Sequence, residues 1–173
     1  MIYCVCGVSG SGKSTIADKL SSALHIDFVD GDSLHPFSNI MKMKNGLALT
    51  DEDRQPWFDA IINHIQANNI INAVLACSAL KEQYRLYLSL SLPIHFIYLK
   101  TSQQTIVDRV RKRENHFLKV NLVESQFATL QEPTASENSN YTVSVVDYDN
   151  LSIKDCIAHI LEKIQFTEMP RVS

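Results

Sequence analysis

A glycine-rich segment near the N-terminus has the residue types and spacing of a phosphate-binding loop, G-x-x-x-x-G-K-[ST]. It reads Gly7, Val8, Ser9, Gly10, Ser11, Gly12, Lys13 and Ser14, and Thr15 follows it. Successive backbone N–H groups in such a loop surround a polyphosphate and add to the positive end of a helix dipole. We expect Lys13 to reach the β- and γ-phosphates and the Ser14 hydroxyl to ligate Mg²⁺. The segment therefore predicts a protein that binds a nucleoside triphosphate through residues 7–15.

Two carboxylates, Asp30 and Asp32, lie one residue apart where a short predicted strand ends. In an open α/β sheet, ligands bind beyond the carboxyl ends of the strands, which would bring this pair close to the loop. One carboxylate could organise Mg²⁺ through its waters, and the other could accept the proton of an attacking hydroxyl. An Asp-Gly-Asp segment is equally typical of a simple turn. The residue types alone leave both interpretations open.

A basic cluster lies at the end of a helix that is predicted to begin at Ser102: Arg109, Arg111, Lys112 and Arg113. Arginines on a mobile segment can neutralise the negative charge that develops on a transferred phosphoryl group. Arg109 and Arg113 are four residues apart and share a helix face. The alternative is a solvated helix end favoured by the helix dipole, and Arg111 and Lys112 fit that alternative.

Strands and helices alternate along the whole chain, which predicts a parallel sheet covered by helices on both faces. The expected strands are 2–6, 26–29, 71–77, 94–99 and 143–147. Thr50 is expected to cap a helix that Pro56 kinks or restarts, Ser78 to cap a short helix, and Ser152 to cap the last one. The pattern breaks over 114–121, and a further helix is expected to follow.

The composition excludes several classes of protein. With 173 residues, 45% of them hydrophobic and 20% charged, the chain predicts one globular domain. A net charge of −3 gives no basic surface for nucleic acid, and no apolar run is long enough for a membrane span. The chain opens almost directly on a predicted strand, so we expect no signal peptide and a cytoplasmic location. Four cysteines without C-x-x-C spacing are expected to be reduced core residues: Cys4, Cys6, Cys77 and Cys156.

Several blocks of residues, in this order, resemble the signatures of gluconate kinases. They are 31–36 with Asn39, Lys42, Met43, Gly46 and Leu49; 50–54 with Pro56 and Trp57; 76–81 with Tyr84 and Arg85; and 116–117 with 125–127, Leu130, Glu132 and Pro133. Together with the phosphate loop, the resemblance covers roughly residues 2–150. It implies a three-layer P-loop kinase fold of the nucleoside-monophosphate-kinase type, related to shikimate kinase. This α/β fold has a five-stranded parallel sheet and a small helical lid, which we expect to be mobile, at about 111–121.

The same resemblance implies an activity and a set of site residues. The activity is ATP-dependent phosphorylation of D-gluconate at its 6-hydroxyl, giving 6-phospho-D-gluconate for the pentose phosphate pathway, and the assembly is a homodimer. Asp32 would be the general base and Asp30 the indirect Mg²⁺ partner of Ser14. The remaining implied residues are Arg54, Lys81, Arg85, His35 and His116 for the acceptor, Arg109 for the nucleotide, and Lys13 and Arg113 for catalysis.

The chain departs from the family pattern at Ser33, Ala48 and Asn115, where a bulkier residue, proline and glycine are common. Two other functions therefore stay open at this point. One is a P-loop kinase of another small sugar acid or anionic metabolite. The other is a nucleotide-gated binding protein, although the sequence offers an acceptor carboxylate and cations rather than switch segments. A nucleoside acceptor would need an apolar slot for its base, and the region offers little beyond Phe37.

Overall fold

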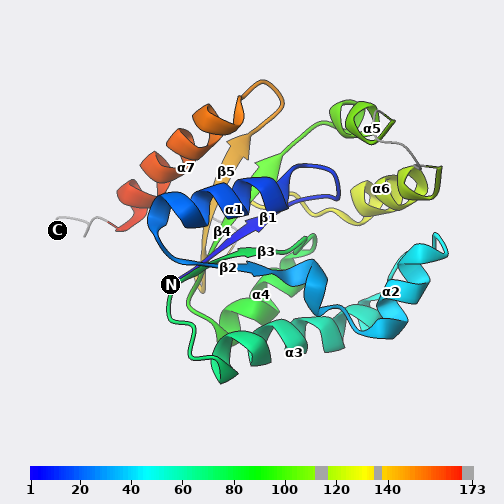
Figure 1. Ribbon diagram of the computed structural model, residues 1–173, viewed down its shortest axis with the longest axis horizontal. Coiled ribbons are helices and arrows are strands. Elements are labelled where there is room, and N and C mark those ends of the chain that lie inside the picture. The colour runs from blue at the N-terminus through cyan, green and yellow to red at the C-terminus, as the bar shows by residue number, and fades with distance from the viewer. Residues whose placement is uncertain (112–116, 135–137, 169–173) are drawn as a thin grey trace.

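A computed structural model of the chain describes residues 1–111, 117–134 and 138–168 (Figure 1). The strands are β1 (Ile2–Cys6), β2 (Asp27–Asp30), β3 (Ala73–Ala76), β4 (Ile94–Lys100) and β5 (Thr142–Asp147). The helices are α1 (Lys13–Leu24), α2 (Phe37–Lys44), α3 (Asp51–Ala67), α4 (Glu82–Ser91), α5 (Gln103–Arg111), α6 (Phe117–Thr129) and α7 (Ile153–Glu168). A single 3-10 turn, η1 (Gly31–Leu34), follows β2. Each predicted strand is confirmed to within two residues at either end.

All strand pairs are parallel, and the strand order is β2-β3-β1-β4-β5. Helices α1 and α7 cover one face of the sheet, and α3 and α4 cover the other (Figure 1). Helices α2, α5 and α6 lie beyond the end of the sheet where the strands finish (Figure 1). The α/β fold with a five-stranded parallel sheet, which the alternating elements and the family resemblance predicted, is therefore confirmed.

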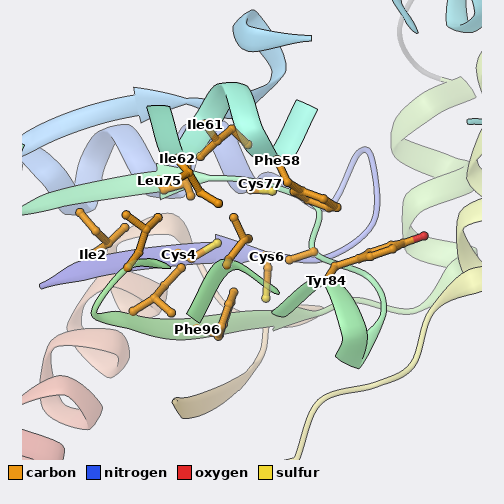
Figure 2. Packing of buried hydrophobic residues seen from close by; sticks show 14 of the residues in the cluster. Ile2, Cys4, Cys6, Phe58, Ile61, Ile62, Leu75, Cys77, Tyr84 and Phe96 are labelled. Atoms are coloured by element: carbon orange, nitrogen blue, oxygen red, sulfur yellow. The ribbon is translucent and has the colours of Figure 1, made fainter. Parts of the chain in front are cut away.

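The central strand β1 is buried on both faces, which explains why its sequence is apolar throughout. Cys4 and Cys6 point to the core beneath α3 and α4, together with Phe58, Ile61 and Phe96 (Figure 2). Tyr3 and Val5 point to the opposite core beneath α1 and α7. All four cysteines are free and buried, as expected. Burial, with the neighbouring Cys77 thiol, raises the pKa of the Cys4 thiol, so it packs as an uncharged group.

The start of α3 carries the predicted cap, and the helix does not restart at its proline. The Thr50 hydroxyl accepts the Asp53 N–H and the Asp53 carboxylate accepts the Thr50 N–H, which makes a reciprocal capping box. The helix continues through Pro56 to Ala67 without a restart. Pro56 removes one backbone hydrogen bond, and the burial of Trp57 and the residues behind it compensates for that loss.

The predicted cap of α4 at Ser78 is wrong. Helix α4 begins four residues later, at Glu82, with Lys81 in the capping position. The Ser78 carbonyl instead accepts the Gly7 N–H of the phosphate loop at 3.2 Å. The segment between β3 and α4 is therefore a connection shaped by the loop beside it, with Ala79 at a positive φ of 40°. The predicted cap of α7 is confirmed, since the Ser152 hydroxyl accepts the Asp155 N–H at 3.1 Å.

The region expected to form a lid is described only in part. Helix α6 begins at Phe117, inside the predicted range of about 111–121, and residues 112–116 lie outside the described part of the chain. No helix within the described ranges is both long and apolar enough to cross a membrane.

Candidate active site

The phosphate loop joins β1 to α1, and no side chain caps the start of α1. Gly12, the residue before α1, adopts a positive φ of 100° and carries no capping hydrogen bond. A Cβ at that position would lie 3.2 Å from the Tyr148 ring, so both the backbone conformation and the space favour glycine. Residues of the loop, including Ser14 and Thr15, line a cavity of about 220 Å³. The first turn of α1 opens on this cavity and offers an anion site of the kind found at helix N-termini.

Lys13 lies at the floor of this cavity, buried, with its ammonium donating to the Val8 carbonyl at 3.0 Å. Burial lowers the pKa of Lys13 from its ordinary value, and the charge of Asp32 opposes that shift. Burial disfavours the charged ammonium, and a polyphosphate in the cavity would stabilise it with negative charge. Lys13 is therefore suited to bind a polyphosphate.

A second cavity of about 170 Å³ adjoins the first and is walled by η1, α2, α3 and α6. Ser9, Lys13 and Asp32 line both cavities. The two cavities therefore adjoin at these three side chains. We call the first the phosphate cavity and the second the acceptor cavity.

The two predicted carboxylates have different positions. Asp32 has an exposed side chain that lines both cavities. Asp30 lines neither cavity among the described residues, and its carboxylate accepts the Asp32 N–H at 3.1 Å. A Cβ on Gly31 would approach the Ala76 carbonyl to 2.5 Å, and the Gly31 carbonyl accepts the Trp57 indole N–H at 2.7 Å. These contacts fix the backbone that carries the Asp32 side chain.

His35 lines the acceptor cavity as an uncharged imidazole. Its ring stacks on Trp57 with centroids 4.0 Å apart and planes at 16°. Burial, opposed by the Asp32 charge and assisted by the Arg54 guanidinium, lowers the pKa of His35 to about 4. At neutral pH the ring can therefore exchange hydrogen bonds with a hydroxyl without adding a charge.

Arg54 is the arginine that reaches the acceptor cavity within the described part of the chain. Its side chain is 7% exposed, and its Nε has no hydrogen-bond partner among the described residues. The guanidinium carbon lies 5.7 Å from the centre of the Tyr84 ring, and the Tyr84 hydroxyl donates to Asp51. A buried guanidinium with a donor left over is suited to an anionic group.

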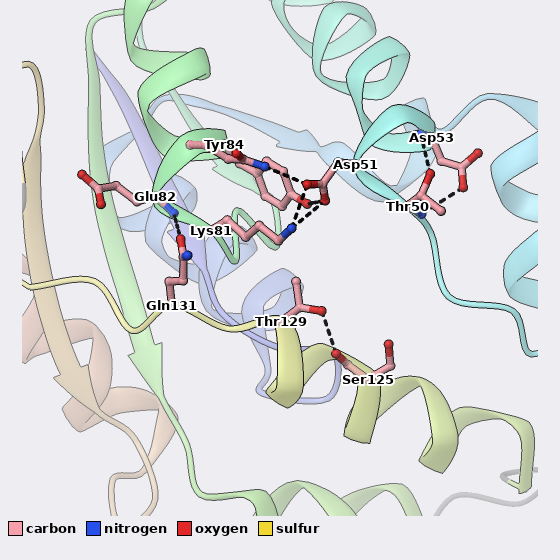
Figure 3. A network of polar contacts seen from close by, with 10 residues as sticks. Thr50, Asp51, Asp53, Lys81, Glu82, Tyr84, Ser125, Thr129 and Gln131 are labelled. Carbon is pink, nitrogen blue, oxygen red and sulfur yellow. Dashed lines mark hydrogen bonds and ion pairs between the residues drawn. The ribbon is translucent and has the colours of Figure 1, made fainter.

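Lys81 and Arg85, the other cations implied for the acceptor, are engaged elsewhere. The Lys81 ammonium donates to both oxygens of Asp51 at 2.8 Å (Figure 3), and these contacts, with that from Tyr84, lower the pKa of Asp51 to about 2. The Arg85 guanidinium is 1% exposed and donates to the carbonyls of Ala79 at 2.8 Å and Gln131 at 3.1 Å. Neither side chain lines the acceptor cavity, and their expected role in binding the acceptor stays a prediction.

Arg109 lies beside the phosphate loop and does not line the acceptor cavity. It donates to the Ser11 carbonyl at 3.2 Å, and its guanidinium carbon lies 5.1 Å from the centre of the Tyr148 ring. This position is compatible with the predicted contact to a nucleotide. Arg113 and His116, which were expected in the lid, lie outside the described residues.

Three parts of the site escaped the sequence analysis. Helix α2 is held against α3, because the Lys42 ammonium donates to both Asp53 oxygens at 2.6 and 2.8 Å. Trp57, expected to be a core residue, is 1% exposed and also walls the acceptor cavity. Helix α6 contributes Leu122, Ser125 and Gln126 to the same cavity. The sequence predicted a helix in this region, and block 125–127 matched the family pattern, but neither indicated that the helix would wall the cavity.

The fold and the two adjoining cavities define a P-loop kinase for a small molecule. A family model for shikimate kinase matches residues 9–165. The thermoresistant gluconokinase of Escherichia coli (strain K12) is 43% identical over 95% of this chain and 93% of its own length. A probable gluconokinase of Schizosaccharomyces pombe is 37% identical over 98% of this chain and 92% of its own. A gluconokinase structure from Sinorhizobium meliloti 1021 has a TM-score of 0.75 and 32% identity, with 96% of each chain covered.

The chain belongs to the gluconokinase family, within the shikimate kinase group of P-loop kinases. The family resemblance stated from the sequence is therefore confirmed.

The buried His35 gives the protein a defined dependence of stability on pH. Its pKa is about 4 in the folded protein and ordinarily 6.5, so between these values the unfolded chain binds a proton that the folded protein does not. This contribution to stability is present above pH 6.5 and is lost as the pH falls toward 4. We expect His35→Gln to lose less of its free energy of unfolding over this range than the wild type, as measured by urea unfolding. The same loss of unfolding free energy with falling pH in both proteins would contradict the lowered pKa of His35.

Proposed function

We propose that this protein transfers the γ-phosphoryl group of ATP to the 6-hydroxyl of D-gluconate. The observation that carries the proposal is that Ser9, Lys13 and Asp32 line both the phosphate cavity and the acceptor cavity, while Arg54 reaches only the acceptor cavity. The gluconokinases of similar sequence support gluconate as the acceptor, and they do not favour the alternative of a different sugar acid.

The inventory of the acceptor cavity suits a small, anionic, hydroxylated molecule. Arg54 supplies a cation for the carboxylate, and a guanidinium binds a carboxylate through paired hydrogen bonds. His35, Ser78 and Ser125 supply neutral groups that donate to or accept from hydroxyls. A volume of about 170 Å³ limits the acceptor to a small metabolite. We therefore propose that Arg54, and neither Lys81 nor Arg85, binds the gluconate carboxylate.

In the proposed reaction Asp32 accepts the proton of the 6-hydroxyl as the sugar oxygen forms its bond to the γ-phosphorus. The bond from that phosphorus to the β–γ bridging oxygen breaks, and the bridging oxygen leaves as part of ADP. Lys13 balances the charge on the phosphates from the floor of the cavity. Each of these residues lines the cavity in which its step takes place.

We propose Mg²⁺ as the cofactor that neutralises the phosphate charge when the nucleotide is bound. The exposed Ser14 hydroxyl lines the phosphate cavity, and this oxygen donor fits a hard cation. Asp30, behind Asp32, is held in place by its hydrogen bond to the Asp32 N–H and would act through a water. The roles of Arg109 for the nucleotide, of Arg113 for catalysis and of His116 for the acceptor stay predictions, as do the mobile lid, the homodimer and the cytoplasmic location.

The proposed reaction can be tested by a coupled assay of ADP release with Mg·ATP, with and without D-gluconate. We expect strong stimulation by gluconate and little by shikimate or free glucose, since neither combines a carboxylate with a terminal primary hydroxyl. Stimulation by another sugar acid in place of gluconate would move the acceptor to that molecule. Equal, slow release with every acceptor would instead favour a nucleotide-gated binding protein.

Replacing Asp32 with Asn removes the proposed proton acceptor while keeping its size. We expect turnover to fall on the order of 10²-fold or more, because general-base catalysis contributes an effect of that size. The affinity for ATP should stay nearly intact, as measured by calorimetric titration. Asp27→Asn, at an exposed position at the start of β2, is the matched control. Unchanged turnover in Asp32→Asn would rule out Asp32 as the general base.

The choice of Arg54 over Lys81 predicts a contrast between two variants. Arg54→Lys should raise the KM for gluconate about 10- to 100-fold, the range expected when a charged hydrogen-bonded contact is lost. Its KM for ATP should change little. Lys81→Met should leave the KM for gluconate close to that of the wild type, because Asp51 already neutralises this ammonium. A larger effect in Lys81→Met than in Arg54→Lys would reverse the assignment.

A further inference from the structure

Helix α6 forms hydrogen bonds with the phosphate loop through the side chain of Gln126. Its amide oxygen accepts the Ser9 N–H at 2.6 Å, and its amide nitrogen donates to the Ser9 hydroxyl at 2.9 Å. The two residues are 117 positions apart in the chain, so the contact depends entirely on the fold. The pair is reciprocal and uncharged.

The position of this pair follows from the two cavities. Ser9 is one of the three side chains that line both, and Gln126 lines the acceptor cavity beside it. The proposed transfer carries the γ-phosphoryl group from the phosphate cavity to the acceptor cavity, and Ser9 lies where the two cavities adjoin. Of the three phosphates of ATP, we therefore expect the γ-phosphate to lie nearest to the Gln126 amide.

The base of α6 is fixed to the core, which keeps this amide in place. Val123 is 2% exposed and packs with Val8 of the loop and with Leu80. Just beyond the helix, the Gln131 N–H donates to the Leu80 carbonyl at 2.9 Å, and its amide oxygen accepts the Glu82 N–H at 2.8 Å (Figure 3). A side chain supported in this way can hold a geometry that a free loop could not.

We propose that Gln126 recognises the γ-phosphate, so that the protein distinguishes ATP from ADP through α6 as well as through the phosphate loop. The inference rests on the proposed kinase function and adds a residue to it. The amide nitrogen carries two hydrogens, of which one is directed to the Ser9 hydroxyl and the second can donate to a γ-phosphate oxygen. The amide oxygen keeps the Ser9 N–H in position.

A neutral amide has a specific advantage at this point. A carboxylate of the same shape could still accept the Ser9 N–H, but it could not donate, and its charge would repel the γ-phosphate. ADP has no group at this position. The inference therefore predicts that a substitution of Gln126 lowers the affinity for ATP more than the affinity for ADP. A purely structural role of Gln126 would change the two affinities alike.

The test is calorimetric titration of the whole protein with Mg²⁺ and either ADP or a non-hydrolysable ATP analogue. We expect Gln126→Glu to weaken binding of the ATP analogue roughly 10-fold or more, because the new carboxylate would repel the γ-phosphate at short range. The affinity for ADP should stay within about threefold of the wild-type value. ADP has no γ-phosphate, so only a weak, solvent-screened repulsion by the new carboxylate remains. Gln126→Met, which removes both hydrogen bonds without a charge, should weaken the analogue to a smaller extent.

Glu124→Gln, an exposed change on the same helix, is the matched control and should leave both affinities unchanged. Thermal melting of each variant without ligand shows whether it is folded. If Gln126→Glu lost affinity equally for the analogue and for ADP, or lost none for either, the inference would be overturned. Because no acceptor is present, failure of gluconate in the ADP-release assay would leave this result intact, and the two failures are distinguishable.

Discussion

The register of the parallel sheet decides where every functional group of this protein lies. Ile2 at the start of β1 pairs with Ala73 of β3 and with Ile94 of β4, so the three strands begin level with one another. Their carboxyl ends consequently meet at one edge, and the connections that leave that edge touch. The Gly7 N–H donates to the Ser78 carbonyl at 3.2 Å there. The carboxylate of Asp32 and the ammonium of Lys13 reach the same two cavities from different strands for this reason.

The cations near the acceptor cavity are divided between structure and binding by the partners that the fold provides. Arg85 is almost fully buried, and a buried guanidinium must find acceptors, which it does in backbone carbonyls. Lys81 is paired with Asp51, whose second role is to accept the Tyr84 hydroxyl. The Lys81 ammonium and the Arg54 guanidinium both lie close to the Tyr84 ring, 5.5 and 5.7 Å from its centre. This arrangement holds Arg54 beside the cavity without neutralising it.

Some of these features could be predicted from the sequence because they depend on neighbours in the chain. The phosphate loop, the cap at Thr50 and the five strands follow from local spacing and apolar runs, and all are present. The failures depend on distant contacts. Pro56 does not interrupt α3 because Trp57 and its neighbours are buried against the sheet. Ser78 does not cap a helix because its carbonyl is taken by a glycine 71 residues earlier.

The same distinction holds for the site. Asp32 and Lys13 were predictable, because residue type and place after a strand suffice to identify them. That Arg54 alone of three candidate cations reaches the cavity was not predictable, since it depends on Asp51 and on two carbonyls far along the chain. The part played by α6 was equally hidden, because an uncharged glutamine has no distinctive signal in a sequence.

The neutral residues of the site matter because its charges are few and close together. Lys13 and Arg54 face one carboxylate, Asp32, while both proposed substrates are anions. In a partly buried cavity each added charge would act strongly on all of these groups. His35, pressed against Trp57 with its pKa lowered to about 4, and Gln126, an amide, can exchange hydrogen bonds with hydroxyls and phosphate oxygens without altering that balance. Charge in the acceptor cavity is thereby confined to the three side chains that we propose act on the charged or ionising parts of the substrates.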